Sequence, residues 1–244
     1  MLVSLAGASA AGGLPGGAAK GAPSWAGGAE GCFREQGEAE VRTCMTRYLE
    51  RNMPPWDVDN RGTLELGILG TTVELALEAR KNHSWAGDVP WGTFKDWVLP
   101  YASVNEARSA WRGLFAAELA PLVKGAASRR EALLRLNRGL WSALRPWGPI
   151  VFRHQQTPLI YDPMSTVAYG YASCTGISIV LVDALRSVGV PARLVGTPAW
   201  NGDVAAGNHN WVEAWIEEED EEQAAGGAQS GGSGWGFPEG LPAG

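Results

Sequence analysis

The spacing of apolar residues divides the chain into a helical half and a half in which strands surround one helix. From about Arg34 to Leu144, apolar side chains recur at intervals of three and four residues, which is typical of amphipathic helices. The first such face consists of Val41, Cys44, Met45, Tyr48 and Leu49. We therefore expect helices to dominate this half.

Further helices are expected at about residues 64–81, 88–98, 105–119 and 128–144. Asp88 is the expected cap of the second of these helices. Ser128 and Glu131 have the spacing of a capping box, in which a hydroxyl and a carboxylate satisfy backbone N–H groups at a helix start.

From Pro149 onward the pattern changes to short apolar strands, expected at residues 150–152, 192–197, 209–216 and 235–238, with a loop at 158–169. Ser173 to Val188 reads as a helix that is apolar around most of its circumference, so it should be buried against a sheet. Gly189 fits the position just past its end, and Pro191 prevents its continuation. The fold class predicted is α+β.

The predicted organisation has three parts. Residues 1–31 are rich in Gly and Ala and too poor in large side chains to form a core, so we expect disorder there. A helical region spans 32–148, and a core with a cysteine-bearing helix on a small antiparallel sheet spans 149–244. An acidic, low-complexity insertion occupies 217–234 and reads as a solvated loop; a basic partner or calcium is the alternative use of its acidic run, Glu217 to Glu222.

Composition narrows the classes of function. The formal charge of −6 and the lack of a basic patch argue against nucleic acid as a partner. No segment approaches the roughly 20 apolar residues of a membrane span. The 3 Cys and 3 His show no metal-ligand spacing, so we expect neither metal nor other cofactor. Three cysteines suit a reducing compartment, so we expect a cytoplasmic location, with a weak N-terminal targeting signal as the alternative.

Cys174 is the candidate nucleophile. It lies at the start of the apolar helix, where unpaired N–H groups and the helix dipole favour a thiolate and can also bind an oxyanion. Taken alone, the same residue is better interpreted as a small buried apolar side chain, and His209 is what favours the catalytic interpretation.

His209 is the candidate general base and acid, because it opens a strand that can pack on the cysteine helix. Trp211, on the same strand face, would shield the pair from water, and Gln155 and Gln156 are chemically able to donate to an oxyanion or bind substrate. The alternative for His209 is an ordinary histidine at a strand end. His83 and His154 are weaker candidate bases.

Three linked motifs carry a family resemblance. Cys174 opens the helix, Arg186 is followed by Gly189-Val190-Pro191-Ala192-Arg193, and the strand reads His209-Asn210-Trp211-Val212-Glu213. In order and spacing these resemble the transglutaminase-like superfamily, which shares the papain-like architecture of cysteine enzymes. The resemblance covers about residues 165–217 and implies Cys174 as nucleophile with His209 as base.

The family normally adds an acidic residue that orients the histidine, shortly after a Trp on the next strand. Here the nearest candidate is Glu239, four residues past Trp235. The sequence leaves three alternatives: Glu239 fills this role, the residue is missing through truncation, or none is needed.

The resemblance implies a cysteine-dependent acyltransferase or hydrolase that acts on amide bonds of a protein or peptide through a thioester. Hydrolysis is favoured over cross-linking, because amine transfer requires a groove that excludes water. The alternative is a catalytically decayed domain that binds peptides or proteins. The sequence does not indicate an oligomeric state.

Overall fold

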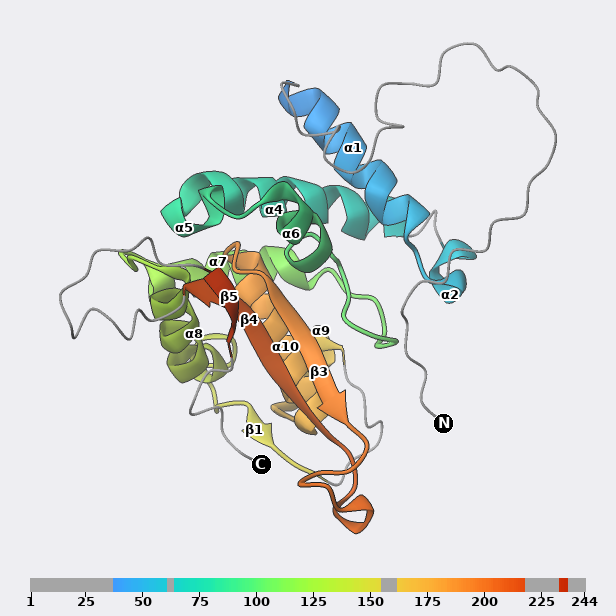
Figure 1. Ribbon diagram of the computed structural model, residues 1–244, viewed down its shortest axis with the longest axis vertical. Coiled ribbons are helices and arrows are strands. Elements are labelled where there is room, and N and C mark those ends of the chain that lie inside the picture. Colours follow the sequence, from blue (N-terminus) through green and yellow to red (C-terminus); the bar gives the residue numbers. More distant parts are fainter. Residues whose placement is uncertain (1–36, 61–63, 155–161, 218–232, 237–244) are drawn as a thin grey trace.

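The computed structural model describes residues 37–60, 64–154, 162–217 and 233–236. Helices make up the first half of the described chain, as predicted (Figure 1). They are α1 (Glu38–Arg51), α2 (Pro55–Val58), the π-helix η2 (Glu65–Leu69), α4 (Gly70–Asn82), α5 (Ser84–Gly87), α6 (Trp91–Trp97), α7 (Trp111–Val123) and α8 (Arg129–Ala143).

The second half combines two small sheets with two α-helices, which confirms the α+β class. Its elements are β1 (Val151–Phe152), α9 (Pro163–Tyr169), β2 (Tyr171–Ala172), α10 (Cys174–Ser187), β3 (Ala192–Thr197), the 3₁₀ turn η3 (Val204–Ala206), β4 (His209–Glu217) and β5 (Ser233–Gly236). Strands β3, β4 and β5 form an antiparallel sheet in that order, and β1 pairs with β2 in parallel.

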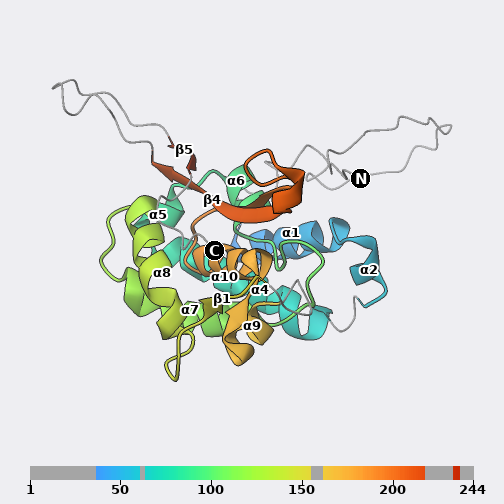
Figure 2. The same cartoon turned by 90° about the horizontal axis from the view of Figure 1, so that it is seen from below.

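Helix α10 is the centre of the fold. It lies between the three-stranded sheet on one side and α7 and α8 on the other (Figure 2). Almost its whole length is buried, because it is apolar around its circumference, as the sequence predicts.

A Schellman motif ends α10. Gly189 adopts φ +80°, and the amides of Gly189 and Val190 donate to the carbonyls of Arg186 (3.2 Å) and Leu185 (2.9 Å). A Cβ on Gly189 would lie 2.5 Å from the Cβ of Ala86, so both the backbone conformation and the packing require glycine here.

Two hydrophobic cores hold the helices and the sheet. The larger joins α7 and α8 to α10 and to the face of β4 that packs on α10. It therefore contains residues from both sides of the predicted boundary at residue 148. The smaller lies among α1, α4 and α6, and Trp215 of β4 packs against it. The predicted boundary between a helical region and a core stays a prediction, since the larger core is shared by both.

Buried charges connect α10 to the helical half. Arg112 of α7 donates to the carbonyls of Arg186 (2.9 Å) and Val98 (2.8 Å), and Arg186 donates to the carbonyl of Trp97 (3.0 Å). Burial lowers the pKa of Arg112 to about 9 and raises the pKa of the neighbouring Asp183. Truncating one member of such a cluster leaves another buried charge without compensation, so we assign it a structural role.

Three helix predictions need correction. The expected loop at 158–169 contains α9, because Asp162 caps its N-terminus by accepting from Met164 N (3.0 Å) and Ser165 N (3.2 Å). Pro90, rather than Asp88, occupies the N-cap of α6.

The helix expected at 105–119 begins only at Trp111. Glu106 instead accepts the amides of Ser103 (2.7 Å) and Val104 (2.8 Å), and Arg108 pairs with Asp57 of α2 (2.9 Å). These contacts hold the preceding residues in a non-helical loop. By contrast, the predicted cap of α8 is confirmed, since Ser128 Oγ accepts from Glu131 N (3.1 Å).

The predicted insertion has narrower bounds in the structure, because Glu217 ends β4 and β5 begins at Ser233, two residues before the predicted strand. Glu217 is not part of a solvated loop: its carboxylate accepts the amides of Arg129 (3.3 Å) and Arg130 (3.2 Å) at the start of α8. Residues 218–232 and the predicted disordered segment 1–31 lie outside the described residues.

Candidate active site

Cys174 is the first residue of α10, preceded by Ser173 in an extended conformation at the N-cap. The first main-chain hydrogen bond of the helix runs from Ile177 N to Ser173 O (2.9 Å). The amides of Cys174 and Thr175 therefore come before the helical ladder and have no acceptor within the helix. The half-buried thiol thus lies where a helix N-terminus offers N–H donors and positive potential.

Strand β4 brings His209 to the same end of α10. His209 is the first residue of β4 and pairs with Thr197, the last residue of β3. The neighbouring residue, Asn210, contacts α10 directly, since its Nδ2 donates to Thr175 Oγ1 (2.6 Å) and its carbonyl accepts from Ser178 Oγ (3.3 Å). The start of β4 is therefore fixed beside the residue that follows the thiol.

Asn210 is a site residue that the sequence reasoning missed. It lies on the inner face of β4, followed at every second position by the buried Val212 and Ala214. A polar residue at an inward position of an otherwise apolar face was the available signal. Gly196 lies opposite on β3, and a Cβ there would collide with the Asn210 amide, so glycine makes room for this contact.

His209 lies on the other face of β4. Its ring packs against those of Trp200 and Trp211, with centroids 4.0 Å and 6.3 Å away. Burial lowers the pKa of His209, which favours the neutral imidazole that a general base requires. Within the described residues, no hydrogen bond joins His209 to Cys174; the two are adjacent in sequence to Asn210 and Thr175, whose side chains are hydrogen-bonded to each other.

Trp211 lies half-buried beside His209, and its role as a shield of the Cys174–His209 pair stays a prediction. Further along the same face, Glu213 accepts from Arg193 (2.6 Å), whose guanidinium lies 4.0 Å from the ring centroid of Trp235. The outer face of β4 thus carries aromatic rings and two ion pairs, Glu213 with Arg193 and Glu217 with Arg129, whereas its inner face is apolar except for Asn210.

Three predicted site residues, Gln155, Gln156 and Glu239, lie outside the described residues. Their assignment as oxyanion donors or substrate contacts, and as the orienting acid, stays a prediction.

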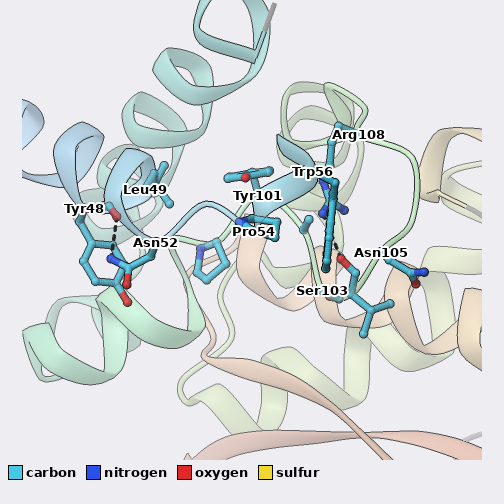
Figure 3. A pocket seen from close by; sticks show the side chains of 12 residues that line it. Tyr48, Leu49, Asn52, Pro54, Trp56, Tyr101, Ser103, Asn105 and Arg108 are labelled. Atoms are coloured by element: carbon cyan, nitrogen blue, oxygen red, sulfur yellow. Dashed lines mark hydrogen bonds between the residues drawn. The ribbon is translucent and has the colours of Figure 1, made fainter. Parts of the chain in front are cut away.

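A pocket of about 770 Å³ lies elsewhere, between the end of α1, α2 and the loop before α7 (Figure 3). Tyr48, Trp56, Tyr101 and Arg108 are among its lining residues, and neither Cys174 nor His209 reaches it. The candidate site at the end of α10 is therefore separate from this pocket.

Three findings bear on metal, membrane and compartment. The described residues contain no group of three or more His, Cys, Asp or Glu side chains placed to hold a metal ion. None of the described helices has the length and hydropathy needed to cross a bilayer. Cys44 is disulfide-bonded, and the compartment of the protein stays a prediction.

Comparison with known proteins agrees with the motifs. The family model of the transglutaminase-like superfamily core matches residues 122–235, which include α8, Cys174, His209 and Trp235. Searches of curated proteins and of solved structures found no match. Residues 122–235 therefore form a core domain of the transglutaminase-like superfamily.

Proposed function

We propose that this protein is a thiol enzyme that cleaves amide bonds through Cys174, with His209 as general base and acid. The observation that carries the proposal is the placement of a half-buried thiol on the first turn of α10, beside the strand end that bears His209, whose pKa burial lowers. Membership in the superfamily supports the same pair of residues.

In the proposed reaction, His209 accepts the proton of the Cys174 thiol, and the thiolate attacks the carbonyl carbon of the amide. The amides at the start of α10 bind the resulting oxyanion. The C–N bond then breaks, the departing amine takes the proton from His209, and a thioester remains on Cys174. Water attacks this thioester, giving its proton to His209, and the carboxylic acid leaves as the thiolate re-forms.

This mechanism requires the imidazole to reach the thiol around the end of β4. Catalytic hydrogen bonds are often long in substrate-free enzymes and tighten in the complex with substrate. Hydrolysis is the proposed outcome, since the half-buried thiol is accessible to water and transfer to an amine requires its exclusion.

The second candidate function is a peptide-binding domain that has lost catalysis. The specific observation in its favour is the missing hydrogen bond between Cys174 and His209 in the described part of the chain. In that case Cys174 would have no nucleophilic role.

Acylation by p-nitrophenyl acetate separates the two candidates. We expect rapid release of p-nitrophenolate with the acetyl group on Cys174, followed by faster transfer to water than to added methylamine. His209→Gln should slow acylation by roughly 10²- to 10³-fold, as expected for a lost general base. The matched control is His154→Gln, an exposed histidine, which should leave the rate unchanged.

No acetyl group on Cys174, or acylation that is equally fast in His209→Gln, would contradict the enzyme proposal. Preferential transfer to methylamine would contradict hydrolysis alone and would favour cross-linking chemistry.

A further inference from the structure

The hairpin between β3 and β4 has a defined conformation, held by main-chain and side-chain hydrogen bonds. At its tip, Asn201 and Gly202 have φ +54° and +78°, and Asp203 N donates to Trp200 O (3.0 Å). Positive φ at both central residues defines a type I′ turn, for which Asn-Gly is a favoured pair. The hydrogen bond of this turn fixes the main-chain carbonyl of Trp200.

The rest of the hairpin fixes the main-chain amide of Trp200. The carboxylate of Asp203 accepts from Ala205 N (2.8 Å) at the start of η3, and Gly207 turns the chain back with φ +79°. The amide of Trp200 then donates to Gly207 O (2.9 Å). Trp200 is therefore held by hydrogen bonds on both sides within the hairpin.

This loop places the indole of Trp200 against the imidazole of His209, with the two ring planes tilted by 55°. The two ring centroids are 4.0 Å apart, and Trp211 lies on the other flank, 6.4 Å from Trp200. Trp200 remains 40% exposed, so the contact does not serve to bury an apolar side chain in the core. Its neighbour on the hairpin, Val204, is 81% exposed.

The charged groups near His209 are engaged elsewhere. Glu213, on the same face of β4, pairs with Arg193 of β3, and the Asp203 carboxylate accepts from Ala205 N within the hairpin. Cys174 is the titratable group at the adjoining end of α10. Burial is the cause of the lowered pKa of His209, and in the described part of the chain no carboxylate hydrogen-bonds to its ring.

We infer that Trp200 is a positioning residue for His209. Its ring fixes the plane of the imidazole and excludes water from one side of it, the role that an orienting carboxylate serves in other Cys–His enzymes. The inference rests on the proposed function of the Cys174–His209 pair and deepens it, because it assigns the orientation of the base to a residue of the hairpin.

The test compares Trp200→Ala, Trp200→Leu and Trp200→Phe with the matched control Val204→Ala, which changes an apolar side chain of the same hairpin. The pKa of His209 is measured by NMR in a Cys174→Ala background, with His209→Gln assigning the resonance. We expect the pKa to rise toward the ordinary value of about 6.5 in the Ala and Leu variants. It should stay lowered in the Phe and Val204→Ala variants.

A second readout links the contact to the thiol. With Cys174 intact, iodoacetamide alkylation at pH 6 should fall about tenfold in Trp200→Ala and Trp200→Leu, part of what a positioned base contributes. Trp200→Phe should retain most of the rate of the unaltered protein. Thermal unfolding of each variant identifies any that fails to fold. If Trp200→Ala does not fold, Trp200→Leu and Trp200→Phe still allow the comparison.

The inference is overturned if the Ala or Leu variant leaves the pKa of His209 unchanged. It is also overturned if that pKa rises while alkylation of Cys174 does not respond. Failure of the proposed function is a different result: alkylation that does not respond to His209→Gln, whatever the Trp200 variants do to the pKa.

Discussion

The two faces of β4 differ in composition and in purpose. The inner face, with Val212 and Ala214 fully buried against α10, contributes to the larger hydrophobic core. The outer face carries His209, Trp211 and Glu213, all half-buried and in contact with rings or charges. At the start of β4, alternation thus separates a stabilising inner surface from the outer surface that bears His209, whereas Trp215, further along the outer face, packs against the smaller core.

The comparison explains how the site is fixed without itself being part of the core. Asn210 is the one polar residue on the inner face of β4, and its bond to Thr175 locks the strand to the start of α10. His209, one residue earlier, lies on the opposite face and contacts Trp200 of the β3–β4 hairpin. We therefore expect inner-face substitutions to change stability, and substitutions at the first outer-face positions, His209 and Trp211, to change reactivity.

The largest expected effect on activity is that of Cys174→Ala. Loss of the thiol should abolish acylation, because no thioester can form. The free energy of unfolding should change by less than about 1 kcal/mol, since the side chain is half-buried at a helix end. Full acylation in this variant would contradict the assignment of the nucleophile.

On the inner side, Leu181→Ala should lower the free energy of unfolding by about 2–5 kcal/mol, because it opens a cavity in the buried centre of α10. Val195→Ala, on the half-buried outer side of β3, is the comparison and should cost about 1 kcal/mol. Urea denaturation measures both. Equal losses would mean that the outer face is as much a part of the core as the inner face.

Gly196→Ala tests the contact that fixes the start of β4, next to His209, on α10. The new methyl group would displace the Asn210 amide and break its bond to Thr175, at a cost of about 1–3 kcal/mol in unfolding free energy. Gly92→Ala is the control, because a Cβ there meets no atom within 4 Å. In an Asn210→Ala background the loss from Gly196→Ala should shrink; an undiminished loss would contradict the steric explanation.

A smaller effect is expected from the ion pair of Arg193 and Glu213 on the outer face. A double-mutant cycle with Arg193→Met and Glu213→Gln should give a coupling of about 1 kcal/mol or less, decreasing with added salt, since both side chains are partly exposed. A coupling well above this value would show that the outer face contributes to stability as the core does.

The smallest effect is a pH dependence from His209. Because burial lowers its folded-state pKa, the unfolded chain binds more protons between that value and about 6.5. Stability should therefore rise with pH through this window and be lost as the pH falls through it. Urea midpoints measured across the window should show a weaker dependence in His209→Gln, and an unchanged dependence would assign it to another group.

The strands around the candidate site could be predicted from the sequence. Alternation fixed β3 at 192–197, as observed, and placed β4 within one residue of its end. The helix α10 and its glycine stop were also predicted, because apolar periodicity and a left-handed C′ residue are local signals. Short α9 was missed, since seven residues carry too little periodicity to outweigh the turn-forming residues around them.

Contacts between elements could not be predicted from the sequence. The start of α7 depends on Glu106 and Arg108, which are held by partners in the loop and in α2. Likewise, the sequence placed Cys174 and His209 on the right elements, but it did not show that Asn210 faces the helix or that Trp200 covers the imidazole. These features follow from strand register and hairpin geometry, which no single-residue preference encodes.

The central claim is that His209 activates Cys174, and the most direct test is the rate of iodoacetamide alkylation at Cys174 across pH 5–10. In the unaltered protein, the account predicts substantial alkylation at pH 6, where an isolated thiol is almost entirely protonated. In His209→Gln, alkylation at pH 6 should largely disappear, while the rate at pH 10 should be retained. Superimposable profiles for the two proteins would contradict the account and leave Cys174 as a structural residue of α10.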